Sequence, residues 1–297
     1  MRQTVSACVF DVDNTLFDWV GSWHSAFRSQ LNALVRLTGI SEDVLKREFR
    51  IVHQRYGTTE YTYALEELPC LKQELFGGEF RLVCGQARHE YHRARTRSLR
   101  LYPGVMRTLS ALQRRGCRLV AYTESTASHA ADRFRKLGLD GVFDALYSSA
   151  DGQPLGCRSR RYDSPRRALR RTEHRLVPKG ATKPNAEVLR TILADIDANV
   201  ATTVYVGDSR SKDIAMANSL GLASVLAAYG VPCDDQACAL LREVSHWSDS
   251  DIRRELAVQA APDSPFLQPD FVLHSTLEEV LDHFEFVAAP SQASAVA

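Results

Sequence analysis

The feature that most constrains the fold is an apolar run near the N-terminus that ends in two carboxylates. Residues 7–10 read Ala-Cys-Val-Phe, and Asp11 and Asp13 follow them. A short apolar run is typical of a buried strand, and parallel α/β folds collect functional groups where such strands end. Two anions this close repel each other, and a bound Mg²⁺, which takes one or two carboxylates with waters and phosphate oxygens, would offset that repulsion. The motif therefore favours a metal site that serves phosphate chemistry.

Two other structures would also fit an Asp-x-Asp sequence. One is an EF-hand calcium loop, which needs Gly at its sixth position and Glu at its twelfth. Counted from Asp11, those positions hold Leu16 and Ser22, so this interpretation fails. The other is a plain turn with an aspartate cap, which fits these residues as well as a metal site does. The remainder of the chain decides between them.

Three later segments place further polar side chains in a similar context. They are the strand-like run 118–123, which ends in Thr123 and precedes Glu124, the pair Lys183-Pro184, which looks like a helix start, and the strand-like run 203–207, which precedes Asp208 and, five residues on, Asp213. Taken singly, each has an ordinary explanation, because Thr123 is a common strand-end residue, Lys183 a common surface residue, and Asp208 a good helix N-cap. Three of the four motifs directly follow a strand-like run, and this shared context favours a single site.

This order of Asp-x-Asp, Thr, Lys and paired Asp motifs resembles the haloacid dehalogenase (HAD) superfamily, in its phosphatase branch with a helical cap inserted after the first motif. The resemblance runs from Ala7 to about Phe284. It implies an α/β fold with a doubly wound parallel sheet, and the alternation of strand and helix patterns indicates the same architecture. The chain contains no GxGxxG or GxxxxGK[ST] loop, which disfavours dinucleotide binding and P-loop chemistry.

Sequence patterns also suggest how the chain is divided. We expect a catalytic core from residues 1–17 and 101–287, a helical cap over 18–100, an Arg-rich insertion loop over 151–180, and a disordered tail over 288–297. The cap prediction rests on apolar residues at three- and four-residue spacing between Trp19 and Val35 and on further helical patterns up to residue 98. The Arg-rich loop reads as a solvated loop with a short helix, or as a rim that attracts anions toward Lys183. The segment 232–265 looks like a polar helical insertion without readable chemistry.

The resemblance implies catalytic roles for the first motif. Asp11 would attack phosphorus and become an aspartyl-phosphate, which splits phosphoryl transfer to water into two easier displacements. Asp13 would protonate the leaving oxygen and then activate the water that hydrolyses this intermediate. Its main-chain carbonyl would also reach the metal.

The later motifs would bind the metal and the phosphoryl group. Asp208 would be a direct Mg²⁺ ligand alongside Asp11, and Asp213 would hold the metal or its waters. Thr123 would donate its hydroxyl to a phosphoryl oxygen, and Lys183 would neutralise the developing charge.

Two further positions are candidates for substrate binding. Glu124 stands where the family commonly has Asn or Gly, and an acid beside a phosphate is unfavourable unless it points away or pairs with a cation such as Arg210. In the cap, Tyr56 and the nearby Tyr61 and Tyr63 would either stack on a base or sugar of the substrate or pack the cap against the core.

Composition excludes several classes of protein. The chain of 297 residues carries 37 Lys and Arg against 36 Asp and Glu, so its net charge gives no case for nucleic-acid or membrane binding. No apolar run approaches the roughly 20 residues of a membrane span, and we see no signal peptide. Seven scattered cysteines fit a reducing cytosol, so we expect a cytoplasmic protein. The pairs Cys233–Cys238 and His89–His92 lack a second pair at zinc-ligand spacing.

We therefore predict a Mg²⁺-dependent phosphomonoester hydrolase that acts on a small phosphorylated metabolite such as a nucleotide, phosphoglycolate or a sugar phosphate. The sequence leaves open a HAD-family phosphomutase and a non-catalytic HAD-like regulatory module. A haloacid dehalogenase is disfavoured because that branch lacks the second aspartate, which Asp13 supplies here. A nucleic-acid role would rest only on the Arg-rich loop. Neither the substrate nor the oligomeric state follows from these motifs.

Overall fold

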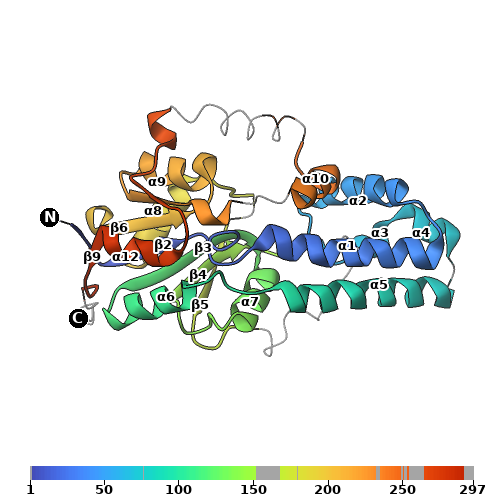
Figure 1. Cartoon of the computed structure of the whole chain (residues 1–297), viewed down its shortest axis with the longest axis horizontal. Coiled ribbons are helices and arrows are strands. Elements are labelled where there is room, and N and C mark those ends of the chain that lie inside the picture. Colours follow the sequence, from blue (N-terminus) through green and yellow to red (C-terminus); the bar gives the residue numbers. More distant parts are fainter. Residues whose placement is uncertain are drawn as a thin grey trace. The chain divides into compact units, whose positions relative to one another are not determined.

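The chain forms two compact units. The computed structural model describes residues 2–75, 77–151, 168–178, 180–231, 235–248, 250, 253 and 264–290. The first unit falls within residues 1–17, 100–231 and 258–297 and contains the strands, whereas the second falls within 18–99 and 232–257 and is helical (Figure 1).

The first unit is built on a fully parallel sheet of seven strands, and the predicted α/β fold is thereby confirmed. In spatial order the strands are β5 (Glu173–Val177), β4 (Ala145–Ser149), β3 (Arg118–Thr126), β2 (Ala7–Phe10), β6 (Thr203–Gly207), β7 (Ala223–Ala227) and β8 (Phe271–Leu273). Chain order runs outward from β2 through β3, β4 and β5 on one side and through β6, β7 and β8 on the other. The winding therefore reverses beside β2, and in open α/β sheets ligands bind at the carboxyl end of such a switch point. Asp11 directly follows β2.

Helices pack against both faces of this sheet (Figure 1). They include α6 (Val105–Arg114), α7 (Ala127–Lys136), α8 (Ala186–Asp195) and α9 (Ala215–Ser219). Val9 and Tyr122 share one buried cluster with α8 and α9. Phe10 points the other way, to Phe143, which also contacts Phe134 of α7. Because successive strand residues face opposite sides, a strand that is covered on both faces must be apolar throughout, as β2 is.

Short elements complete this unit. They are β1 (Gln3–Val5) and β9 (Phe284–Phe286), which pair in parallel, α12 (Val280–His283), and 3₁₀ turns at Val200–Thr202, Ala228–Gly230, Pro265–Leu267 and Leu277–Glu279. The helix α12 is short, because the chain enters β9 at Phe284.

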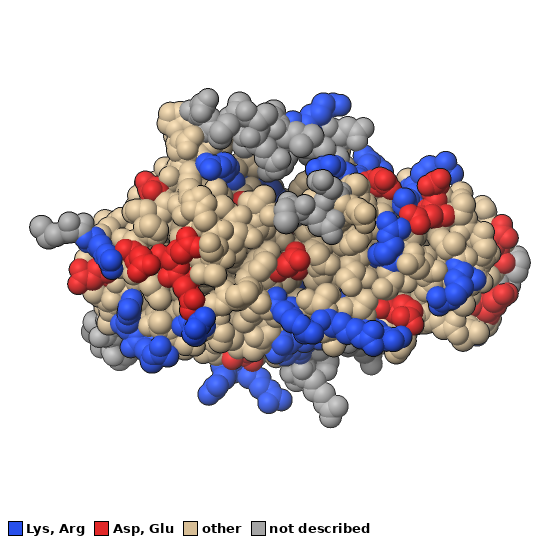
Figure 2. Space-filling view, in the orientation of Figure 1, with Lys and Arg blue, Asp and Glu red and all other residues tan. Residues whose placement is uncertain are grey.

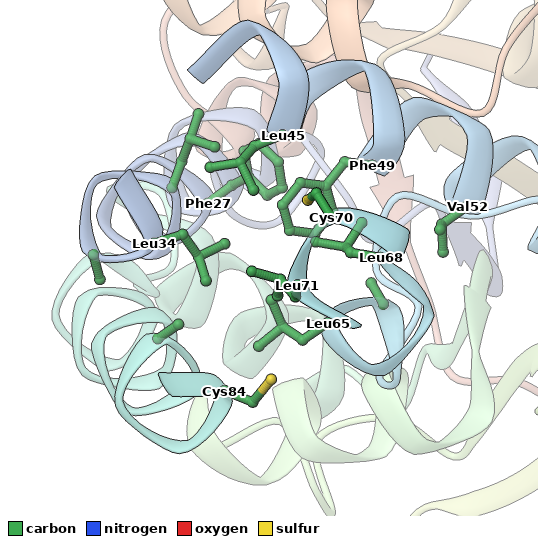
Figure 3. Close-up of a cluster of buried hydrophobic side chains, with 14 of the residues drawn as sticks. Phe27, Leu34, Leu45, Phe49, Val52, Leu65, Leu68, Cys70, Leu71 and Cys84 are labelled. Atoms are coloured by element: carbon green, nitrogen blue, oxygen red, sulfur yellow. The ribbon is translucent and has the colours of Figure 1, made fainter. Parts of the chain in front are cut away.

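The second unit is a cluster of helices with its own apolar core. The helices are α1 (Trp19–Thr38), α2 (Glu42–Tyr56), α3 (Ala64–Glu67), α4 (Pro69–Glu74), α5 (Gly77–Ser98) and α10 (Asp235–Val244). Figure 3 shows Phe27 of α1, Phe49 of α2 and Leu71 of α4 directed toward a common centre. The first helix ends at Gly39, where a positive φ of 71° suits a residue without a side chain.

Two segments differ from the sequence prediction. The strand β5 lies within the segment 151–180, which we expected to be a loop with a short helix. Leu176 is exposed and Val177 is buried, but the charged residues of this strand interrupt the alternation of polar and apolar residues that predicts a strand. The helix α10 belongs to the helical unit, whereas the sequence grouped 232–265 with the core. Leu240 and Val244 of α10 are buried in the helical core cluster, which is a long-range contact that local pattern does not reveal.

Some predictions fall outside the described residues. These are the arginines at 158, 160, 161, 166 and 167 of the predicted loop, and residues 291–297 of the predicted tail.

On the face shown in Figure 2, basic and acidic side chains are interspersed. Among the helices that are described, none has the length and apolar character needed to cross a bilayer.

Candidate active site

Three carboxylates meet at the carboxyl edge of the sheet, beside the switch point. Asp11 follows β2, Asp208 follows the adjacent strand β6, and Asp213 lies in the π-helical turn Arg210–Ile214 that comes next. One ligand oxygen from each lies within 4.8 Å of the others. Parallel neighbouring strands end at the same edge, so residues far apart in sequence become neighbours there.

A buried lysine lies among these carboxylates. Lys183 Nζ is 2.6 Å from Asp11 Oδ1 and 2.9 Å from Asp213 Oδ1, and its side chain is only 2% exposed. The rings of Tyr122 and Tyr205 flank it, with centroids 4.8 and 5.6 Å from Nζ. Burial alone would lower the pKa of Lys183, but the charges of Asp11 and Asp213 outweigh it and hold that pKa well above its usual range. Lys183 is therefore a fixed cation at the site.

The position of Asp213 depends on the glycine that ends β6. A Cβ on Gly207 would lie 2.4 Å from Asp213 Cγ, so no larger residue fits without displacing the carboxylate. Asp213 Oδ1 accepts from the Tyr205 hydroxyl at 3.0 Å, and its Oδ2 accepts from the Ser209 backbone N–H at 3.1 Å. The close approach of the Asp213 side chain explains why a glycine stands at this strand end.

The loop that carries Asp11 packs closely against Tyr229 and Gly230. Thr15 Oγ1 donates to Asp11 Oδ2 at 2.9 Å, and Asn14 adopts a positive φ of 62°. A Cβ on Gly230 would lie 1.7 Å from the Asn14 carbonyl oxygen, and the Tyr229 hydroxyl donates to the Thr15 carbonyl at 2.8 Å. The close approach of Gly230 fixes the loop and hence the place of Asp11.

Asp13 belongs to a second group of contacts. The hydroxyls of Thr123 and Ser125 each donate to Asp13 Oδ2 at 2.8 Å, and Arg133 Nη1 donates to Asp13 Oδ1 at 2.9 Å. Thr123 therefore contacts Asp13 here, and its predicted contact with a phosphoryl oxygen stays a prediction. Sequence reasoning missed Ser125 and Arg133. The spacing of Ser125, two residues after Thr123 on the same strand, was the available signal for it.

Glu124 is paired with a cation, but not with the predicted one. Its Oε2 accepts from Lys212 Nζ at 2.6 Å, and its Oε1 accepts from the backbone N–H of Lys183 at 2.9 Å. Arg210, which we named as one cation that could pair with Glu124, instead donates to the Leu267 carbonyl at 3.1 Å. Glu124 thus anchors the segment that carries Lys183.

Tyr56, the candidate for substrate binding in the helical unit, lies at the end of α2. It stacks on Tyr61 with ring centroids 3.7 Å apart, and both pack on the apolar core of the helical unit. Contact with a substrate stays a prediction for this residue.

The charge balance at the sheet edge suits a divalent cation. Desolvation raises the pKa of Asp11 to about 7, and Lys183 limits that rise. Desolvation, together with the charges of Asp11 and Asp213, likewise holds the pKa of Asp208 well above its usual range. The clustered carboxylates outnumber the buried lysine, and three oxygen donors of this kind fit the ligand preference of Mg²⁺. A bound cation would lower both pKa values, because an opposite charge favours the ionised form.

Comparison with known proteins identifies the family of this chain. A model of the haloacid dehalogenase-like hydrolase family matches residues 5–221. Glyceraldehyde 3-phosphate phosphatase of Methanopyrus kandleri is 25% identical over 224 residues, which cover 74% of this chain and 83% of that protein. The enzyme of the same name from Methanothermobacter thermautotrophicus is 22% identical over 224 residues, covering 75% and 85%.

Solved structures show the same fold. An HAD phosphatase from Thermococcus onnurineus has a TM-score of 0.51 at 17% identity and covers 95% of this chain and 100% of its own. A putative beta-phosphoglucomutase from Thermotoga maritima has a TM-score of 0.51 at 17% identity and covers 94% and 97%. Given the family match over residues 5–221, the chain belongs to the haloacid dehalogenase-like hydrolases and is a phosphatase.

Proposed function

We propose that the chain is a Mg²⁺-dependent phosphomonoester hydrolase that forms an aspartyl-phosphate on Asp11 and acts on a small sugar phosphate. The observation that carries this proposal is the group made by Asp11, Lys183, Asp208 and Asp213. Nucleophile, cation and additional carboxylates lie together there, next to the switch point of the sheet. Glyceraldehyde 3-phosphate is the first substrate to test, because two relatives carry that activity in their names.

The proposed reaction assigns one task to each side chain. An oxygen of Asp11 attacks phosphorus while the bond to the leaving oxygen breaks, and Asp13 supplies a proton to that oxygen. Asp13 then takes a proton from the water that cleaves the phosphoryl group from Asp11. Lys183, fixed among carboxylates and aromatic rings, offsets charge on the phosphoryl oxygens without having to move.

The proposed metal would be held by Asp11 and Asp208, with Asp213 supporting it and the carbonyl of Asp13 as a further oxygen. When bound, Mg²⁺ supplies positive charge that offsets the repulsion between the phosphate and the carboxylates. The helical unit would serve as the cap that excludes water during transfer and selects the substrate.

The proposal is tested by release of inorganic phosphate from a panel of phosphorylated compounds. The panel contains glyceraldehyde 3-phosphate, other sugar phosphates, phosphoglycolate and nucleoside monophosphates, each with Mg²⁺ and with EDTA. We expect metal-dependent release from at least one sugar phosphate, its loss in Asp11→Asn, and its retention in the matched control Asp282→Asn on α12. Conversion of a sugar phosphate into its isomer without phosphate release would instead support the phosphomutase. If neither phosphate release nor isomer formation is detected, the proposed function is refuted.

A further inference from the structure

The helix α7 buries an arginine beside the proposed proton donor. Arg133 is 1% exposed, and its guanidinium lies 5.5 Å from the centroid of the Phe17 ring. Guanidinium is protonated at any physiological pH, so its burial is costly unless an anion pairs with it. Arg133 Nη1 donates to Asp13 Oδ1 at 2.9 Å and also to the Ser125 hydroxyl.

The other oxygen of Asp13 is held as well. Thr123 Oγ1 and Ser125 Oγ both donate to Oδ2 at 2.8 Å, and the Ser125 backbone N–H donates to Thr123 Oγ1 at 3.0 Å. The carboxylate therefore has donors on both oxygens, from β3 and from α7. Rotation about its Cβ–Cγ bond would break contacts on both oxygens, so the group has one defined orientation.

We propose that Arg133 is a positioning residue, which orients the Asp13 carboxyl group toward the leaving oxygen of the substrate. The inference rests on the proposed function, because it requires Asp13 to supply the proton. Arg133 cannot supply that proton itself, since guanidinium does not deprotonate in proteins. Its contribution is the rigid, planar geometry of its donors, which a lysine ammonium on a flexible stem reproduces only in part.

A purely structural role would have different consequences. If Arg133 only compensated a buried charge and held α7 against β3, its loss would impair the enzyme equally for every substrate. A positioning role affects only reactions in which the leaving oxygen needs a proton. An alkyl phosphate needs one, because its alcohol leaves poorly as an alkoxide. In p-nitrophenyl phosphate the phenolate departs without protonation.

The experiment compares kcat/KM for glyceraldehyde 3-phosphate, or the best alkyl phosphate of the panel, with kcat/KM for p-nitrophenyl phosphate. The parameter kcat/KM reports the steps up to departure of the leaving group and excludes the later hydrolysis of the intermediate. The variants are Arg133→Met, Arg133→Lys and Asp13→Asn. Arg135→Met is the matched control, because Arg135 lies on the same helix and pairs with Asp132 at 3.4 Å.

We expect Arg133→Met to lower kcat/KM for the alkyl phosphate on the order of 100-fold, the effect of a small misplacement of a catalytic group. The value for p-nitrophenyl phosphate should change several-fold at most. Arg133→Lys should fall between Arg133→Met and the wild type, and Arg135→Met should match the wild type on both substrates. If Arg133→Met does not fold, as judged by circular dichroism, Arg133→Lys and Ser125→Ala carry the same comparison.

Equal losses on both substrates, or no loss on either, would overturn the positioning role. Failure of the proposed function has a different signature, because Asp13→Asn would then show no selective loss on the alkyl phosphate. If Asp13→Asn discriminates between the substrates and the Arg133 variants do not, only the inference about Arg133 fails.

Discussion

Replacing Lys183 with methionine tests whether this lysine is the internal counter-ion of the carboxylate group. Methionine keeps most of the length and apolar surface of the side chain and removes the charge. In the wild type, Nζ contacts Asp11 and Asp213, whose side chains are 10% and 2% exposed. Removal of one member of a buried ion pair leaves an uncompensated charge and costs about 3–5 kcal/mol. We therefore expect Lys183→Met to lower the free energy of unfolding by about 3–5 kcal/mol in EDTA.

Magnesium should reverse part of this loss. A ligand that binds only the folded state stabilises it by RT ln(1 + [L]/Kd). Without Lys183 the carboxylates attract a divalent cation more strongly, so Mg²⁺ should stabilise the variant more than the wild type. Phosphatase activity should nevertheless stay low, because the variant lacks the cation that we propose offsets charge on the phosphoryl oxygens.

The assay is urea unfolding followed by circular dichroism, with EDTA and with Mg²⁺. Lys136→Met is the matched control, since Lys136 is 40% exposed and pairs with Asp132 at 2.9 Å, and exposed pairs contribute about 0–1 kcal/mol. A Lys183→Met variant as stable as the wild type in EDTA would refute the counter-ion role. Equal stabilisation of both proteins by Mg²⁺ would refute the link between the lysine and the metal site.

Three further substitutions probe other parts of the structure. Gly207→Ala places a Cβ 2.4 Å from Asp213 Cγ, so we expect weaker Mg²⁺ binding by calorimetry and an activity loss on the order of 100-fold; unchanged values would contradict the packing argument. Glu124→Gln removes a negative charge beside the proposed phosphate site and leaves Lys212 without its carboxylate, so KM for the sugar phosphate should fall with little change in kcat. A higher KM would show that the Glu124–Lys212 pair assists substrate binding. Burial lowers the pKa of His53 to about 4, whereas histidine in the unfolded chain has a pKa near 6.5. Between these two pKa values the unfolded state binds a proton that the folded state does not. As the pH drops from about 6.5 to about 4, the free energy of unfolding should therefore decrease by up to about 1.4 kcal/mol per pH unit. In His53→Gln this component of the acid sensitivity should disappear from the unfolding curves, and an unchanged curve would show that other groups control it.

Apart from its edge strand β5, the sequence predicted the parallel sheet and the proximity of the carboxylates, for a physical reason. A strand that is covered on both faces of a parallel sheet is a short apolar run. The polar residue that follows such a strand lies at the carboxyl edge of the sheet. Asp11 and Asp208 therefore had to lie near each other once the two strands were adjacent, and the structure places Asp213 and Lys183 beside them.

The contacts that were missed depend on tertiary packing. Arg133 lies on a helix with Asp132, Arg135 and Lys136, and in sequence such a run resembles a solvated face. Only the packing of α7 shows that, of these four charged residues, Arg133 is the buried one. Which cation pairs with Glu124 also depends on tertiary packing, because the π-helical turn directs Lys212, rather than Arg210, toward it.

The central claim is that Asp11 carries the phosphoryl group between the substrate and water. The most direct measurement is an acid quench of Asp13→Asn during reaction with p-nitrophenyl phosphate, followed by mass spectrometry of its peptides. This variant can form the intermediate because the phenolate leaves without a proton, but it lacks the base that hydrolyses the intermediate. We predict phosphorylation of the peptide that contains Asp11, with none in the Asp11→Asn, Asp13→Asn double variant. Release of p-nitrophenolate without any phosphorylated peptide, or with the phosphoryl group on another residue, would contradict the account.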